Sequence, residues 1–202
     1  AHKKQTMESI NDFVLNYDQN KVKALSGRYI TNHAILPLLK VLPNAFKYEV
    51  IGHSEQNRPI YSVKIGTGKI KILIWSQMHG NESTCTKALF DIFNVLKTTS
   101  FDTILRECSL FIIPILNPDG AESYTRKNAN QVDINRDAID LSQSESKVLR
   151  AVFDAINPDY GFNMHDQRTL FSVGKNNAPA TVSFLSPAQD QALTLTPNRL
   201  RA

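Results

Sequence analysis

The sequence predicts an α/β protein: a three-layer sandwich with a central mixed, largely parallel sheet covered by helices on both faces. Two observations support this prediction. Short β-branched and apolar runs alternate with longer segments in which apolar residues recur at helical spacing. In addition, residues 70–75 form an apolar run and residues 110–116 are apolar throughout, which is typical of strands buried on both faces of a parallel sheet.

Length and composition indicate one globular domain. The 202 residues are 42% hydrophobic and 21% charged, which suffices for one sizeable core. The formal net charge is only +4, with lysines and arginines scattered singly or in pairs, so we expect no nucleic-acid partner. No apolar stretch approaches the roughly 20 residues that span a bilayer, so we expect a soluble chain with no membrane partner. Cys85 and Cys108 are too few for a disulfide framework and are predicted to be buried thiols.

Residues 1–42 are predicted to form a helical N-terminal entry segment ahead of a larger domain over residues 43–202. The entry segment contains two helix-like pieces, Met7–Leu15 and Ile35–Leu42. Pro43 ends the second piece, because proline restricts the residue before it and cannot continue the hydrogen-bonded ladder. The residues predicted to interrupt the segment are Gly27 and Pro37.

Strands and helices alternate through the larger domain. Turn-rich links at residues 56–59 and 66–68 separate its first three strands. Two later segments carry apolar residues at the spacing of an amphipathic helix. The predicted strands are Tyr48–Ile51, Ile60–Ile65, Ile70–Trp75, Leu110–Leu116 and Tyr160–Met164, and the predicted helices are Ser83–Leu96 and Ser144–Ile156.

Polar residues follow three of these predicted strands. His79, Asn117 and His165 come after the strands that end at residues 75, 116 and 164. In open α/β sheets, functional groups collect outside the carboxyl ends of the strands, so we expect these side chains at one rim. Glu82 falls in the first turn of the following helix, where the helix dipole also favours a carboxylate.

Two histidines and one carboxylate in these places predict a catalytic zinc site formed by His79, Glu82 and His165. Such sites use three protein ligands and leave a fourth position open for water or substrate. Taken singly, His79 and Glu82 are more often a helix cap and its neighbour, and His165 is more often a satisfied histidine at a sheet edge. The three together, at strand ends, favour the metal site. With two neutral imidazoles and one carboxylate, zinc keeps a net positive charge, which favours hydrolysis of an amide or ester through a metal-activated water.

From about Tyr29 onward, the chain resembles the zinc metallocarboxypeptidase family of the carboxypeptidase A type. Residues 52–60, Gly-His-Ser-Glu-Gln-Asn-Arg-Pro-Ile, resemble the entry hairpin of that family. His79-Gly-Asn-Glu82 matches its first two zinc ligands, and His165 matches the third. Asn117-Pro-Asp-Gly120 matches a family turn, in which the proline and glycine suit a type I turn. The resemblance implies one Zn²⁺ ion and a carboxypeptidase-like catalytic domain over residues 43–202.

The same resemblance gives roles to residues between the turn and the last histidine. Asn135 and Arg136 match the pair that seats the free carboxylate of a peptide, since a guanidinium binds a carboxylate through two parallel hydrogen bonds. Arg126 is expected to stabilise the oxyanion of the tetrahedral intermediate, with Lys127 as the nearest alternative. The competing interpretation is that these cations form a solvated basic loop.

Three acidic residues near these motifs have further expected roles. Asp137 and Asp140 could orient Arg136, although we favour capping of the helix that begins near Ser144. Asp166 could accept a hydrogen bond from the neighbouring ligand His165, because metal-bound imidazoles usually donate their other N–H to a carboxylate or carbonyl. A backbone carbonyl is an equally good candidate for that partner.

The sequence departs from the family pattern after His165. In the family, a downstream glutamate acts as general base and a tyrosine closes over the substrate, whereas the 37 residues after His165 contain neither residue type. Three explanations are open: a fragment that lacks the C-terminal part of the catalytic domain, a non-catalytic relative, or a base such as Asp166. We favour the fragment, whose fold is then incomplete at the C-terminus.

The sequence therefore predicts a zinc-dependent metallocarboxypeptidase that hydrolyses the C-terminal peptide bond of peptides. Its partner would be a peptide or small amide substrate with a free carboxylate. One alternative is a zinc-dependent deacylase of N-acyl amino acids, similar to aspartoacylase. A second alternative is a non-catalytic module that binds peptide C-termini.

Overall fold

The computed structural model describes residues 15–98 and 101–166. The chain divides into two units, Ala1–Asp166 and Gln167–Ala202, and all of the described residues belong to the first. The helix predicted over Met7–Leu15 lies, apart from Leu15, outside the described residues.

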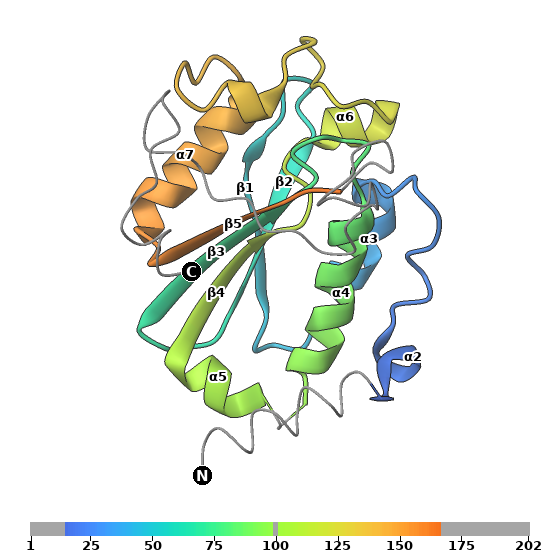
Figure 1. Ribbon diagram of the computed structural model, residues 1–202, viewed down its shortest axis with the longest axis vertical. Coiled ribbons are helices and arrows are strands. Elements are labelled where there is room, and N and C mark those ends of the chain that lie inside the picture. The colour runs from blue at the N-terminus through green and yellow to red at the C-terminus, as the bar shows by residue number, and fades with distance from the viewer. Residues whose placement is uncertain (1–14, 99–100, 167–202) are drawn as a thin grey trace, which may run out of the picture. The chain divides into compact units, whose positions relative to one another are not determined.

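A five-stranded mixed sheet forms the centre of this unit (Figure 1). The strand order is β1-β2-β4-β3-β5. β1 and β2 form an antiparallel hairpin and β2 pairs antiparallel with β4, whereas β3 lies parallel to both β4 and β5. The strands are β1 Lys47–His53, β2 Pro59–Ile65, β3 Ile70–Ser76, β4 Cys108–Ile113 and β5 Tyr160–Met164.

Helices cover both faces of the sheet. α3 and α4 pack on one face and α7 on the other (Figure 1). The predicted α/β fold class is therefore confirmed. The described helices are α2 Tyr17–Asn20, α3 Asn32–Lys40, α4 Thr84–Leu96, α5 Asp102–Glu107, α6 Pro118–Ser123, the 3₁₀ helix η2 Ile134–Arg136 and α7 Ser144–Ile156. Among these described residues, no helix is long and apolar enough to cross a membrane.

The larger core lies between the sheet and helices α3 and α4. Leu89 and Phe93 of α4, and Ile35 and Leu39 of α3, are at most 1% exposed. The two residues named in each helix are four positions apart in the sequence, which places both on the same face of that helix. Because α3 belongs to the same core as the strands, it packs with the sheet. The domain boundary expected between residues 42 and 43 stays a prediction.

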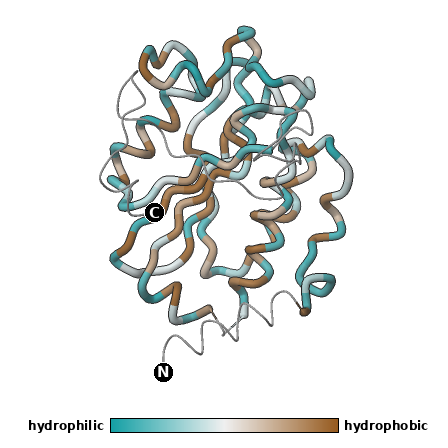
Figure 2. The backbone as a smooth tube through the Cα atoms, viewed as in Figure 1, coloured by the Kyte–Doolittle hydropathy of each residue, from teal (hydrophilic) through white to brown (hydrophobic). Residues whose placement is uncertain are grey.

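A second core lies between the sheet and α7. Leu73 and Ile113 are fully buried there and are packed against apolar side chains of α7, including Val148 and Val152. Figure 2 shows the result along the chain, with hydrophobic colouring on the central strands and along the helices. A sheet buried on both faces explains why β3 and β4 read as nearly continuous apolar runs.

Helix α3 corrects one expectation. Pro37 was expected to interrupt the segment, yet α3 runs from Asn32 to Lys40 with Pro37 inside it. Proline removes one backbone donor from a helix. The burial of Ile35 and Leu39 on either side of Pro37 anchors the helix to the core, so packing outweighs the lost hydrogen bond.

Strand β4 and the segments around it also differ from expectation. The strand was predicted over residues 110–116 but spans Cys108–Ile113, and Pro114 cannot donate to a sheet ladder. The short helix α5 immediately before β4 was not predicted, because one turn and a half carries too little periodicity to recognise.

The Asn117-Pro-Asp-Gly120 motif is a helix start and not a type I turn. Asn117 is the N-cap of α6, and its side-chain oxygen accepts a hydrogen bond from the amide of Gly120 at 2.8 Å. Pro118 occupies the first turn, where its missing N–H costs nothing. Asn117 also donates through Nδ2 to the carbonyl of Met78 at 3.2 Å, so the motif fixes the end of the segment that leads from β3 to His79.

Candidate metal centre

The loop that follows β3 is held in place from two sides. Gln77 has a left-handed φ of 50°, and its side-chain amide donates to the carbonyls of Ile30 and Gly80, each at 2.8 Å. A Cβ atom at Gly80 would collide with the backbone of Gly120 in α6. The loop therefore fits only with glycine at this position, and it presents His79 and Glu82 from a rigid support.

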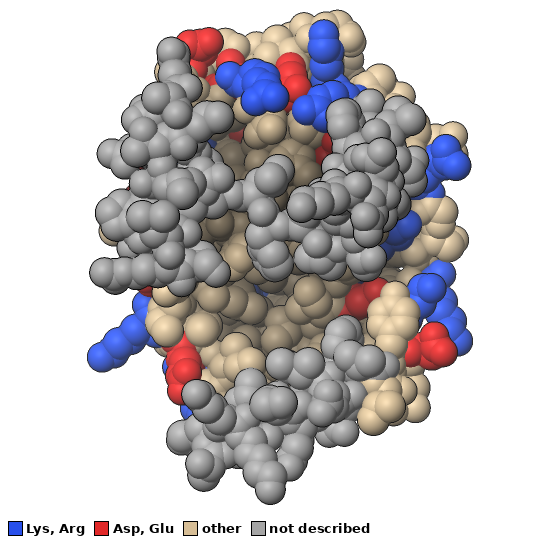
Figure 3. Space-filling model, viewed as in Figure 1, with Lys and Arg blue, Asp and Glu red and all other residues tan. Residues whose placement is uncertain are grey.

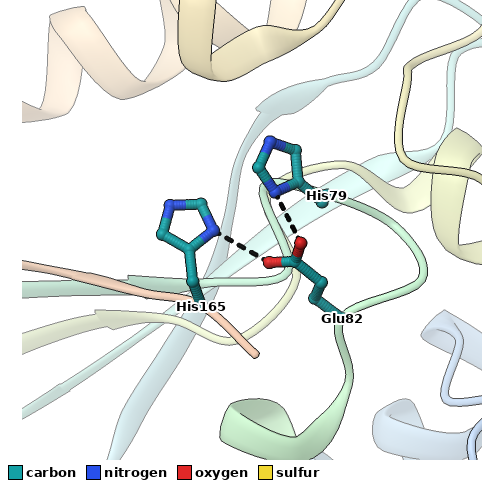
Figure 4. A group of neighbouring side chains, drawn as sticks. All are labelled: His79, Glu82 and His165. Atoms are coloured by element: carbon teal, nitrogen blue, oxygen red, sulfur yellow. Dashed lines mark hydrogen bonds and ion pairs between the residues drawn. The ribbon is translucent and has the colours of Figure 1, made fainter. Parts of the chain in front are cut away.

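Three candidate metal ligands meet beside this loop. The ligand atoms of His79, Glu82 and His165 all lie within 4.8 Å of one another. Nδ1 of His79 is 3.0 Å from Oε1 of Glu82, and Nδ1 of His165 is 2.9 Å from Oε2 of the same carboxylate (Figure 4). The structure thus brings together the three side chains that the sequence singled out, from the β3–α4 loop and from the end of β5.

The hydrogen bonding of His79 leaves the lone pair of its Nδ1 available to a metal ion. Nε2 of His79 lies 3.0 Å from Oδ1 of Asp133, and since a carboxylate only accepts, Nε2 carries the proton. In the neutral ring, Nδ1 then bears a lone pair. This atom is buried and has no hydrogen-bond partner among the described residues, although it faces Oε1 of Glu82. Two lone-pair atoms at this distance are stabilised by a cation between them, so the donor set fits a metal ion.

The Glu82 carboxylate is held in its charged form. Burial acts to raise the pKa of Glu82, but the neighbouring imidazoles of His165 and His79 lower it to about 2. The guanidinium of Arg126 adds to this environment, with NH1 at 3.3 Å from Oε1 of Glu82. The carboxylate is therefore deprotonated at neutral pH and available to a cation.

Asp133 joins the candidate ligands to the predicted substrate residues. Its Oδ1 accepts from Nε2 of His79 and from the backbone amide of Asn135, both at 3.0 Å, and its Oδ2 accepts from Nε of Arg126 at 3.0 Å. Burial acts to raise the pKa of Asp133, but the hydrogen bonds from His79 and Arg126 lower it. No role was predicted for Asp133 from the sequence. The signal was an acidic residue two positions before the Asn-Arg pair.

The two predicted cationic positions have different surroundings. Arg136 at the end of η2 is exposed, and its guanidinium has no hydrogen bond or ion pair within the described ranges. Arg126 is half-buried and paired with both Glu82 and Asp133. Lys127, the alternative to Arg126, is exposed and forms no ion pair with any described residue. The structure therefore places Arg126, and not Lys127, beside the candidate ligands.

Asp166 and Asp137 bind backbone amides. Asp166 accepts from the amides of Thr84 at 3.1 Å and Cys85 at 3.4 Å, so it caps α4, and no hydrogen bond joins its carboxylate to the ring of His165, which is also a described residue. Asp137 accepts from the amides of Ser142 and Gln143, just before α7. Asp137 was expected to cap α7, but the first amide of that helix, on Ser144, donates to the carboxylate of Glu55 instead.

Charged side chains of both signs lie close together on one face of the molecule. Figure 3 shows lysine or arginine side chains interspersed with aspartate or glutamate near the top of the view. This mixed distribution agrees with the small net charge of +4.

Comparison with known proteins places the chain in a family. The family model described as zinc carboxypeptidase matches residues 34–184, so the chain belongs to the zinc carboxypeptidase family. A relative named "Probable carboxypeptidase 2" from Trichophyton verrucosum is 26% identical over 113 residues, which are 54% of this chain and 21% of that protein.

Solved carboxypeptidase structures share the fold. A putative carboxypeptidase from Burkholderia mallei aligns with a TM-score of 0.60 and 25% identity over 66% of this chain and 38% of that one. Carboxypeptidase A from Helicoverpa armigera aligns with a TM-score of 0.64 and 18% identity over 98% of this chain and 58% of that one. The match covers about a fifth of the length of the curated relative named above.

Proposed function

We propose that the protein is a zinc-dependent metallocarboxypeptidase that hydrolyses the C-terminal peptide bond of peptides. The observation that carries this proposal is the meeting of two imidazole nitrogens and one carboxylate within 4.8 Å of one another, in a chain of the zinc carboxypeptidase family. The buried, unpartnered Nδ1 of His79 supports a metal in particular.

Each proposed ligand has a defined donor atom, and His79 also has a supporting contact. Zn²⁺ would be held by Nδ1 of His79, the carboxylate of Glu82 and Nδ1 of His165, and a set of three ligands leaves a fourth position open. A zinc ion bound there supplies a Lewis acid and lowers the pKa of water toward neutrality. Asp133 fixes the tautomer and ring orientation of His79, as carboxylates commonly do for metal-binding histidines.

Asn135 and Arg136 would bind the free carboxylate of the substrate. The guanidinium of Arg136 is exposed and free of partners in the part of the chain that is described, which suits a group that must exchange water for a carboxylate. The hydrogen bond from the Asn135 amide to Asp133 ties this pair to the ligand His79. Asn135 and Arg136 together form a carboxylate clamp. With the terminal carboxylate held there, the last peptide bond would be the one placed for hydrolysis at the metal.

Arg126 would stabilise negative charge on the carbonyl oxygen of the scissile bond. It lies beside Glu82, and its ion pair with Asp133 holds the guanidinium in position before substrate arrives. Preorganised donors of this kind contribute roughly 3–4 kcal/mol to barrier lowering in comparable enzymes.

The described carboxylates next to the candidate ligands are all engaged. Glu82 and Asp133 are bonded to the histidines and Arg126, and Asp166 is bonded to α4. We therefore assign proton transfer from the attacking water to none of the residues 15–98 and 101–166.

Zinc titration of the metal-free protein tests the metal site. One equivalent of zinc should bind, and His79→Ala and His165→Ala should each abolish stoichiometric binding. His53, an exposed histidine at the end of β1, offers a matched control, and His53→Ala should bind zinc normally. If His79→Ala bound zinc as tightly as the wild type, the proposed site would be wrong.

Substrate tests separate the reaction from its alternatives. The zinc-loaded protein should release the last residue of N-acetylated peptides with a free carboxylate, and Arg136→Ala should weaken their binding more than that of the corresponding C-terminal amides. Release of acetate from N-acetyl amino acids without peptide cleavage would indicate a deacylase. Carboxylate-dependent binding without turnover would indicate a binding module.

A further inference from the structure

Asn163 on β5 contacts the proposed carboxylate clamp. Its side-chain Nδ2 lies 3.4 Å from Oδ1 of Asn135 and 3.6 Å from Sδ of Met78. In the sheet, Asn163 is in register with Trp75 of β3, on the face that carries α7. His165 lies two residues further along, just past the end of β5, and side chains alternate along a strand. Asn163 therefore faces the clamp, and the next side chain on the same face is the candidate metal ligand His165.

The contact with Met78 favours one orientation of the Asn163 amide. A thioether sulfur has no proton to donate, so it can only accept. The NH₂ end of Asn163 therefore faces Met78, and the same NH₂ group carries the second proton that is directed to Asn135. Met78 itself is held through its carbonyl by Asn117. Met78 thus favours the orientation in which Asn163 donates its hydrogen bond to Oδ1 of Asn135.

The Asn163 contact in turn determines what Asn135 offers to a ligand. Oδ1 of Asn135 accepts from Asn163 and its backbone amide donates to Asp133. Its Nδ2, a double donor, has no hydrogen-bond partner among the described residues. If the Asn135 amide were turned over, it would present its oxygen, which repels a carboxylate.

We propose that Asn163 is a positioning residue: it holds the side-chain amide of Asn135 with its NH₂ group outward, so that the clamp accepts carboxylates and rejects uncharged C-termini. This inference rests on the proposed function of Asn135 and Arg136. It adds a residue that contacts no substrate and acts through Asn135.

Two variants and one control test the role of Asn163. Asn163→Leu has a similar size and no donor, and Asn163→Asp has the same shape but can only accept. Phe162→Leu lies on the opposite face of β5 and serves as the control. The measurement is the dissociation constant of the zinc-loaded protein for N-acetylated dipeptides that end in Phe, Leu, Lys or Glu, each as the free acid and as the C-terminal amide.

The Asn163 variants are expected to lose discrimination between free acids and C-terminal amides, and not to lose binding of both. Asn163→Leu should weaken free-acid binding by roughly threefold to tenfold, the value of one hydrogen bond. Asn163→Asp should weaken it further, because Asn135 then turns its oxygen outward and a negative charge is added. Amide binding and zinc stoichiometry should stay within twofold of the wild type, and Phe162→Leu should change nothing.

The outcomes separate this inference from the proposed function. If the wild type does not prefer free acids over amides, the clamp itself is wrong. If the wild type does prefer them and both Asn163 variants keep the same ratio, the clamp stands and the role of Asn163 is overturned. If Asn163→Leu fails to fold, the isosteric Asn163→Asp decides alone.

Discussion

At the scale of single residues, the candidate metal centre depends on side chains that orient the ligands. Asp133 holds Nε2 of His79 and Nε of Arg126 with one carboxylate. Outer carboxylates of this kind raise the basicity of the histidine and fix its tautomer. The metal affinity should therefore respond to Asp133, although Asp133 is not a proposed ligand.

Asp133→Asn is expected to lower zinc affinity about 10–100-fold, the range found for such partners of ligand histidines. The amide oxygen can still accept from His79, but the negative charge is lost and so is the ion pair with Arg126. Competition for zinc with a chelator of known affinity measures the change. Asp140→Asn, at an exposed position, is the matched control. Equal affinities for Asp133→Asn and the wild type would contradict the assigned role.

Asp137 links stability to pH. Burial acts to raise its pKa, but hydrogen bonds from Ser142 and Gln143 are among the contacts that lower it from an ordinary 3.8 to about 2. A carboxyl group with a lowered folded-state pKa stabilises the fold above the unfolded value. That stability is lost as the pH falls from about 4 toward 2.

Asp137→Asn should therefore reduce the free energy of unfolding by about 1–3 kcal/mol at pH 7, as expected for hydrogen bonds to a charged group. The difference between variant and wild type should shrink as the pH approaches 3. Urea denaturation at a series of pH values measures it. A difference that stays constant from pH 7 to pH 3 would show that the charge of Asp137 is not responsible.

At the scale of elements, the arrangement depends on the close approach of the His79 loop to α6. A Cβ atom at Gly80 would meet the backbone of Gly120 and Ala121, and backbone cannot move aside as a side chain can. Gly80→Ala should destabilise the protein by about 1–3 kcal/mol, the cost of overpacking, and should weaken zinc binding as well.

Gly161→Ala is the control for this substitution, because a Cβ atom there would lie 3.6 Å from the ring of Trp75, an ordinary contact. Thermal unfolding of both variants, with and without zinc, measures the effects. The account of the loop fails if Gly80→Ala is as stable and binds zinc as well as Gly161→Ala.

The sequence predicted elements with a clear local pattern well, and contacts between residues distant in the sequence poorly. α7 and β5 have the predicted bounds, Ser144–Ile156 and Tyr160–Met164, because periodicity and turn residues are local signals. His79, Glu82 and His165 could be grouped because strand ends share a rim. The role of Asp133 depends on how its segment packs against the loop after β3, and the role of Asn163 depends on how η2 lies against β5. Neither long-range contact can be predicted from a local sequence pattern.

At the scale of the whole molecule, zinc should stabilise the fold by mass action. A ligand that binds only the native state adds about 2.7 kcal/mol at a free concentration 100 times its dissociation constant. For a protein of this size, that corresponds to a rise in melting temperature of roughly 5–10 °C.

Scanning calorimetry in chelator and in excess zinc checks this expectation. The wild type and His53→Ala should show the rise, and His165→Ala should not. A similar rise in His165→Ala would mean that zinc stabilises the protein from another site.

The most direct measurement is X-ray absorption spectroscopy at the zinc edge of the protein loaded with one equivalent. The account predicts a first shell of nitrogen and oxygen at about 2.0–2.2 Å, with scattering from two imidazoles. Cys85 provides a sharp contrast, because its Sγ lies 3.4 Å from the carbonyl of His165 and its pKa is raised to about 11, by burial first of all. A sulfur neighbour at about 2.3 Å, or fewer than two imidazoles, would contradict the site formed by His79, Glu82 and His165.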